Sequence, residues 1–270
     1  MQKLWHTRPA PPGDETEHAV RHWSALWEKS PLPSPKAVAA LRRREEYRIM
    51  RPFLENLPGK RIMDAGCGMG EWTLFLVDQG FETVGLDLSR ETIARLCERH
   101  PRVRFIQGDV RATGLEAESC DAILSWGVFE HFEDGPGACL DEAWRVLRPG
   151  GKLFLTVPFH NVRHLLRALR WRGREKAIPG RARAFYQWRL TPAELADALE
   201  QAGFDVLLMR PIHLQEGLRR LLSVDLGLRN GLLLDICSYG LAKGLSLLIP
   251  RGLACHMLMA VAGKPERELA

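Results

Sequence analysis

The chain has 270 residues, of which 46% are hydrophobic and 26% charged, and its formal net charge is +5. This length suits one large domain with additions, and the composition is ordinary for a globular protein. The opening residues lack the pattern of a secretory signal, and the six cysteines form no C-x-x-C pair. These features argue against a secreted, disulfide-stapled or zinc-ribbon protein, so we expect a cytoplasmic location.

The N-terminal part is expected to be a helical leader that spans residues 1–57. Residues 1–13 are rich in proline and are expected to be loose. Helices are predicted over 14–29 and 36–57, with a proline-rich break between them. The main domain is then expected to span 58–270.

The most informative pattern is a short apolar run that ends at Asp64 and is followed by glycines at positions 66, 68 and 70. An amphipathic pattern begins at Glu71, so these residues predict a strand, a tight turn and a helix. Glycine allows a sharp turn and the close approach of a ligand. A second strand-like run ends at Asp87, which completes a unit that can hold a ribose, with the carboxylate on the sugar hydroxyls.

The spacing of the glycines indicates which nucleoside this turn would bind. A dinucleotide site has the pattern G-x-G-x-x-G and faces a pyrophosphate with the start of its helix. Here the third glycine comes one residue early, and Glu71 would repel a pyrophosphate. A phosphate-free, cationic nucleoside therefore suits the turn better than NAD.

Strands and helices alternate along the main domain. This order predicts an α/β fold with a doubly wound, mostly parallel, seven-stranded sheet that helices cover on both faces. Thr191, Pro192 and Glu194 have the pattern of a capping box at a helix start, and Gly203 suits its end. The strands are expected near 61–64, 82–87, 103–107, 120–125, 152–157, 204–212 and 254–262, and the helices near 70–79, 90–99, 136–147 and 191–202.

Two insertions interrupt this alternation. The first, at about 160–190, holds nine Lys or Arg residues against one Glu, a local charge of +8, with aromatic residues between them. We considered contact with an anionic membrane, contact with RNA, and a solvated lid without a partner.

The second insertion, at about 214–251, is unusually apolar. Its 232–249 stretch contains two charges and is short for a transmembrane helix. The alternatives are helices that pack on the core, a homodimer face, and an element that lies on the membrane surface.

Five segments, in this order and at this spacing, resemble the motifs of class I S-adenosylmethionine (SAM)-dependent methyltransferases, above all the small-molecule and quinone-biosynthesis enzymes. The segments are 64–70, Asp87, 107–110, 121–132 and 145–152. The resemblance implies SAM as cofactor and S-adenosylhomocysteine as product. It implies cofactor contacts from the following residues: Asp64, Ala65, Gly66, Cys67, Gly68, Gly70, Asp87, Leu88, Asp109, Val110, Ser125, Trp126 and Gly127.

The candidates for a general base are His131 and His160, because histidine titrates near neutral pH and both follow a predicted strand. We expect no metal site. The histidine pairs 18/22 and 160/164 lack a neighbouring acid or cysteine that would complete one. The D-P-P-Y motif of amine methylation is absent, which argues against the exocyclic amines of DNA bases.

We therefore expect an enzyme that methylates a small amphiphilic or anionic molecule, such as a lipid, a quinone-like compound or a lipid-linked sugar. Peripheral contact with the inner membrane face would fit the two insertions. Two alternatives stay open at this point. One is an RNA methyltransferase that uses the basic segment 163–189, and the other is a non-catalytic SAM-binding regulatory protein.

Overall fold

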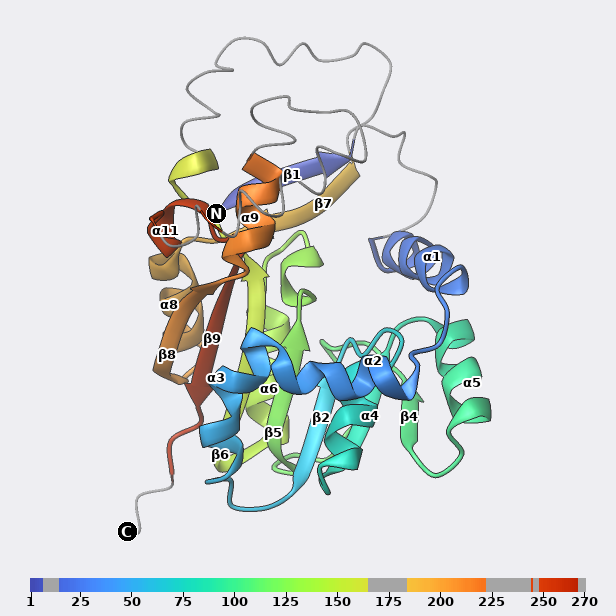
Figure 1. Cartoon of the computed structure of the whole chain (residues 1–270). Coiled ribbons are helices and arrows are strands. Elements are labelled where there is room, and N and C mark those ends of the chain that lie inside the picture. The colour runs from blue at the N-terminus through green and yellow to red at the C-terminus, as the bar shows by residue number, and fades with distance from the viewer. Residues whose placement is uncertain (7–14, 165–183, 222–243, 245–247, 267–270) are drawn as a thin grey trace.

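The computed structural model describes residues 1–6, 15–164, 184–221, 244 and 248–266 (Figure 1). The strands in these ranges are β1 (Gln2–His6), β2 (Arg61–Ala65), β3 (Glu82–Asp87), β4 (Arg104–Gln107), β5 (Cys120–Trp126), β6 (Leu147–Pro158), β7 (Ala184–Arg189), β8 (Asp205–Ile212) and β9 (Met257–Gly263). The helices are α1 (Glu15–Glu28), α2 (Pro35–Ala40), α3 (Glu45–Leu54), α4 (Glu71–Asp78), α5 (Arg90–Arg99), α6 (Gly137–Val146), α8 (Pro192–Gln201), α9 (Leu214–Arg220) and α11 (Arg251–Ala254), with 3-10 turns η1 (Leu41–Arg43) and η2 (Phe129–His131).

Within the described residues, one sheet has seven strands in the order β4-β3-β2-β5-β6-β9-β8. The pairs from β4 to β6 are parallel, and β9 runs antiparallel to both β6 and β8. The predicted doubly wound, mostly parallel sheet is therefore confirmed. The strand order reverses between β2 and β5, and in such sheets ligands bind beyond the carboxyl ends at this reversal.

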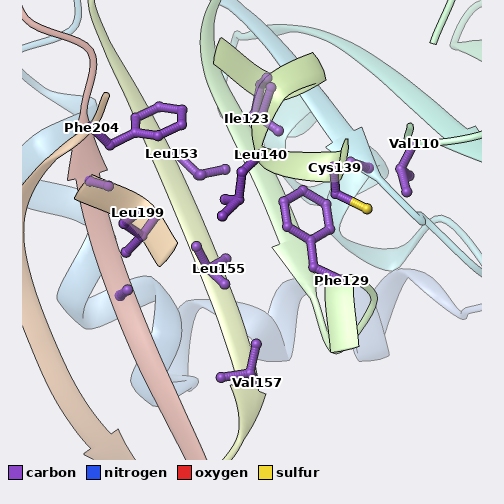
Figure 2. Close-up of a cluster of buried hydrophobic side chains, with 14 of the residues drawn as sticks. Val110, Ile123, Phe129, Cys139, Leu140, Leu153, Leu155, Val157, Leu199 and Phe204 are labelled. Carbon is purple, nitrogen blue, oxygen red and sulfur yellow. The ribbon is translucent and has the colours of Figure 1, made fainter. Parts of the chain in front are cut away.

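Helices cover both faces of the sheet, and alternate strand residues point to opposite sides. On one face Ala122, Leu124 and Phe154 pack with residues of α2, α3 and α4. On the other face Ile123 and Leu153 pack with residues of α6 and α8. Figure 2 shows this second cluster, with the phenyl rings of Phe129 and Phe204 in the same layer as side chains of β5 and β6. The sheet is thus a rigid platform for the loops at its edge.

Local sequence explains where several helices begin. Ser34 and Ser89 accept hydrogen bonds from the backbone of the first turns of α2 and α5. The capping box at the start of α8 is present as predicted, with Thr191 and Glu194 each bonded to the backbone of the other.

The predicted single helix over 36–57 is wrong, because the chain breaks at Arg44. Arg44 is extended (φ −64°, ψ 147°), and a new helix, α3, starts with Glu45 and Glu46 in its first turn. Acidic side chains favour a helix N-terminus. Glu46 also lies 2.9 Å from Nε2 of His213, which ties α3 to the end of β8.

The expectation that residues 1–13 are loose is wrong for residues 2–6. These form β1, which pairs antiparallel with β7, a strand inside the basic insertion that was also not predicted. The ammonium of Lys3 lies 3.1 Å from Glu133 and 5.0 Å from the ring centroid of Trp188. The ion pair ties the ribbon to the loop after η2, and the cation–π contact joins its two strands.

Two further boundaries differ from the prediction. Strand β6 starts at Leu147, because Leu147 pairs with Cys120 before the register shifts. The last strand starts at Met257, after the short helix α11. The parts of the two insertions at 165–183, 222–243 and 245–247 lie outside the described residues. None of the helices described in the structure is long and apolar enough to cross a bilayer.

Candidate active site

A cavity of about 210 Å³ lies at the carboxyl ends of β2, β3 and β5. Most of the side chains around it are apolar, and several are aromatic. It is lined by Trp23, Trp27, Gly66, Asp87, Leu88, Val110, Trp126, Gly127, Val128, His131 and Phe132. Of the residues predicted from the sequence, the structure brings Gly66, Asp87, Leu88, Val110, Trp126, Gly127 and His131 to this cavity.

The glycine turn borders the site through its first glycine, Gly66. Gly66, Gly68 and Gly70 have φ values of +79°, +50° and +75°, a region that glycine adopts without strain. A Cβ on Gly66 would lie 2.4 Å from a methyl of Val128. Glycine is therefore needed here both for the backbone conformation and for space beside the cavity.

Asp87 ends β3 with its carboxylate beside this turn. One oxygen accepts the backbone N–H of Gly68 and the other that of Ser89, both at 2.9 Å. Burial raises the pKa of Asp87, and the two hydrogen bonds oppose that effect. Each carboxylate oxygen keeps a further lone pair, so Asp87 can accept bonds from a pair of hydroxyls such as those of a ribose. The turn and the carboxylate therefore fit the nucleoside of SAM.

Val110 and Leu88 give the next part of the wall an apolar surface. Asp109, which was expected to contact the cofactor, does not line the cavity. Its carboxylate is bound by Arg111, with Nη2 at 2.7 Å from Oδ2. The guanidinium of Arg111 in turn lies 4.4 Å from the ring centroid of Phe132, which does line the cavity.

Other predicted cofactor residues lie behind the wall. Asp64 is 2% exposed and accepts a hydrogen bond of 2.7 Å from Thr73 of α4. Burial raises the pKa of Asp64 to about 6 and raises that of the Cys67 thiol well above its ordinary value, so Cys67 is not an activated nucleophile. Ala65, Gly68, Gly70 and Ser125 also do not line the cavity.

The end of β5 and the η2 turn after it place further polar groups at or near the cavity. The indole N–H of Trp126 is buried and has no hydrogen-bond partner within the described residues, and the same holds for the hydroxyl of Ser125. Nδ1 of His131 lies 2.7 Å from the carbonyl oxygen of Tyr186. His131 is thus held on β7 at the edge of the cavity.

Helix α1 covers the site. The Trp23 ring meets His131 edge-on, with ring centroids 4.9 Å apart, and Trp23 and Trp27 stack at 6.0 Å. A Cβ on Gly68 would lie 3.0 Å from the Trp27 indole, so this ring rests on the glycine turn. The sequence prediction missed both tryptophans as site residues. Their spacing of four, on one face of a predicted helix, was the available signal.

His160, the second candidate base, lies elsewhere. It does not line the cavity, and its ring centroid is 6.0 Å from that of His164. Burial lowers the pKa of His160. Among the described residues, no three His, Cys, Asp or Glu side chains gather as a metal site. The side chains of the pair at 18 and 22 lie outside the described residues.

Comparison with known proteins decides the family. The model of the methyltransferase domain family matches residues 40–208, well over half of the chain. The chain belongs to the class I SAM-dependent methyltransferases. SAM is the cofactor of this family, and the predictions of family, enzyme class and cofactor are confirmed.

Curated relatives of this methyltransferase cover its central part. A probable SAM-dependent methyltransferase of Mycolicibacterium smegmatis is 30% identical over 167 residues, 61% of this chain and 59% of the relative. A ubiquinone biosynthesis O-methyltransferase of Hahella chejuensis is 32% identical over 164 residues, 57% of this chain and 66% of the relative. The chain thus spans about three-fifths to two-thirds of the length of these relatives.

Solved structures share the fold. The 1,6-didemethyltoxoflavin-N1-methyltransferase of Burkholderia thailandensis, bound to 1,6-didemethyltoxoflavin and S-adenosylhomocysteine, has a TM-score of 0.57 and 21% identity. The match covers 98% of this chain and 96% of that one. At this identity, the likeness shows the fold alone.

Proposed function

We propose that this methyltransferase transfers the methyl group of SAM to a hydroxyl of an amphiphilic, quinone-like small molecule. One observation carries the proposal: a single cavity joins the carboxylate of Asp87 to a wall of aromatic side chains that includes His131. The first part suits the sugar of SAM, and the second suits a flat apolar acceptor. The relatives named as ubiquinone biosynthesis O-methyltransferases support this class of acceptor.

In the proposed reaction, the protein mainly has to position the two reactants and exclude water from them. SAM supplies an already activated methyl group on a sulfonium. The protein must hold the acceptor in line with it and exclude water. Trp23 and Trp27 of α1, together with Val128 and Phe132, give the cavity an apolar lining that would help to exclude water. His131 is the group in the cavity that can take the proton of an acceptor hydroxyl.

We also propose that the acceptor is collected at an anionic membrane surface. The side chain of Leu248 is 81% exposed and that of Leu253 is 41% exposed, beside Arg251 of α11. Helix α9, which ends in Arg219 and Arg220, packs against α11 through Leu218 and Ala254. Exposed leucines next to arginines support contact with lipid and its anionic head groups.

Calorimetry with S-adenosylhomocysteine and with NAD tests the cofactor half of the proposal. We expect binding of the former alone. Profiling the metabolites of a deletion strain for a compound that lacks one methyl group then tests the acceptor. Turnover that depends on added RNA, with a steep salt dependence, would instead favour the RNA methyltransferase. SAM binding without any methylated product would favour a regulatory protein.

Flotation with liposomes tests the membrane half. We expect binding to vesicles with phosphatidylglycerol and weaker binding to pure phosphatidylcholine. The double variant Leu248→Ser/Leu253→Ser should reduce flotation, whereas Leu207→Ser, at an exposed leucine on β8, should not. Equal behaviour in both kinds of vesicle would contradict the anionic surface. If the protein elutes as a dimer in size exclusion and the double variant elutes as a monomer, the leucines form a homodimer face instead.

A further inference from the structure

Glu130 has a buried carboxyl in which one oxygen, Oε2, is left without a hydrogen bond within the described residues. The residue lies in η2 and is 2% exposed. Burial raises the pKa of Glu130 to about 8. A buried polar group that lacks a hydrogen bond lowers the stability of the fold, and a buried charge lowers it further. An ionised carboxyl at this position therefore lowers the stability of the fold.

Glu142 shows what a structural buried glutamate looks like in this protein. It is 9% exposed, and its Oε1 accepts bonds from the backbone and hydroxyl of Thr113 at 2.8 and 2.6 Å. Arg145 adds a contact of 2.7 Å, and hydrogen bonds from Arg145 lower the pKa of Glu142 to about 2. The contrast points to a different role for Glu130.

The neighbour of Glu130 in the cavity is His131. A carbonyl oxygen can only accept, so Nδ1 of His131 carries the hydrogen of its 2.7 Å contact with Tyr186. In the neutral ring Nε2 then carries the lone pair. Oε1 of Glu130 lies 3.9 Å from this Nε2. The backbone of β7 sets the tautomer, and the carboxyl stands beside the nitrogen that would take a proton.

We propose that Glu130 is a positioning residue that stabilises the imidazolium formed when His131 Nε2 takes the proton of the acceptor hydroxyl. This inference rests on the proposed function. The acceptor O–H bond breaks as its proton moves to Nε2, and an electron pair of the oxygen forms the new O–CH₃ bond. The C–S⁺ bond of SAM breaks, and its electrons return to sulfur to leave a neutral thioether. Above its pKa of about 8 the Glu130 carboxylate is negative, and it then lowers the energy of the cation on His131.

The charged and titratable groups around this pair do not replace Glu130. Burial raises the pKa of Tyr186, from β7, and of Cys139, from α6, so both are neutral at pH 7–9. Asp109 and Arg111, from the loop after β4, are paired with each other. A change of charge at Glu130 is therefore expected to reach His131 directly.

An NMR titration tests the coupling without any acceptor. The protein is labelled with ¹⁵N-histidine, and His131→Gln identifies the resonances of His131. We expect the Nδ1–H tautomer in the wild type. Fitted to the data above pH 8, where Glu130 is ionised, the protonation constant of His131 should be at least threefold lower in Glu130→Gln. Glu142→Gln should leave this constant unchanged. Equal constants in wild type and Glu130→Gln would overturn the proposal.

Thermal unfolding separates a functional from a structural role. At pH 9 the wild type holds an ionised Glu130, so Glu130→Gln should melt at the same or a higher temperature. Glu142→Gln, which loses an ion pair with Arg145, should melt at a lower one. Melting of Glu130→Gln well below the wild type would mean that the carboxyl holds the fold, and the proposal would fail.

Turnover with SAM and 4-hexylcatechol completes the test. Glu130→Gln should lower kcat at least tenfold, keep KM for SAM within twofold, and move the rising limb of the pH profile to lower pH. Glu142→Gln should keep the wild-type profile. If the wild type yields no methylated product, the proposed acceptor class fails, and the NMR result still decides the role of Glu130.

Discussion

The hydroxyl of Thr73 donates a 2.7 Å hydrogen bond to Oδ2 of Asp64 and so joins the first turn of α4 to the end of β2. Both side chains are buried behind the glycine turn. Asp64 therefore holds the turn from below instead of meeting the cavity. The raised pKa of Asp64 can therefore be tested through its effect on stability.

Asp64→Asn should stabilise the protein in a pH-dependent way. Burial raises the pKa of Asp64 from 3.8 to about 6, so folding carries a penalty that grows as pH rises from 4 to 6 and is complete above 6. This difference between the pKa values of the unfolded and folded states corresponds to about 3 kcal/mol of unfolding free energy. We expect a gain of about 1–3 kcal/mol in unfolding free energy at pH 8 and almost none below pH 4, measured by urea unfolding.

Asp121→Asn is the control for this variant. Asp121 is fully buried, accepts from the backbone N–H of Arg61 and pairs with Arg148 at 3.1 Å. Loss of its charge should destabilise the protein at pH 8. The same gain for Asp64→Asn at both pH values would contradict the shifted pKa.

Asp87→Ala should weaken binding of S-adenosylhomocysteine at least tenfold, about 1.4 kcal/mol, because the carboxylate beside the glycine turn is lost. Calorimetry measures the affinity, and circular dichroism checks the fold. Asp78→Ala, at an exposed carboxylate on α4, should bind as the wild type does. An unchanged affinity for Asp87→Ala would place the ribose elsewhere.

Arg95→Ala should loosen the cover formed by α1. The guanidinium of Arg95 donates to the carbonyl oxygens of Trp27 at 3.0 Å and Ser30 at 3.1 Å, at the C-terminal end of α1. We expect binding of S-adenosylhomocysteine to weaken about three- to tenfold and proteolysis within α1 to speed up. Arg99→Ala changes an exposed residue of α5, the helix that also carries Arg95. It should change neither the affinity for S-adenosylhomocysteine nor the rate of proteolysis.

Gly66→Ala should destabilise the protein by about 2 kcal/mol or more, through a positive φ and a clash with Val128. Gly80→Ala isolates the first effect, because its φ is +88° and no atom lies within 4 Å of its Cβ. We expect a cost of about 1 kcal/mol there. Urea unfolding of Gly66→Ala/Val128→Ala should show whether the clash has been relieved. Equal costs at the two glycines would contradict the close contact.

The parts that could be predicted from sequence are those that depend on local order. Three alternate glycines between Asp64 and Glu71 need a particular backbone, so the turn could be located without a structure. The alternation of strands and helices leads to a parallel sheet because crossovers have one hand. The capping box could also be predicted, because Thr191 and Glu194 are only three positions apart in the sequence.

The parts that were missed depend on contacts between distant segments. Residues 2–6 become a strand because β7 offers a partner more than 170 positions later in the chain. The break at Arg44 is stabilised by a contact between Glu46 and His213 that local sequence cannot show. Boundaries that rest on such pairs do not follow from propensity.

The sequence alone therefore determined the family, the sheet and the place of the glycine turn, because short-range steric rules act between neighbouring residues. Only the tertiary structure decided what surrounds that turn. It brought Trp27 from the leader onto Gly68 and stacked Trp23 beside it, turned Asp109 toward Arg111, and left Oε2 of Glu130 without a hydrogen bond beside His131. Packing and burial set these relationships, and they arise only when segments far apart in the chain meet.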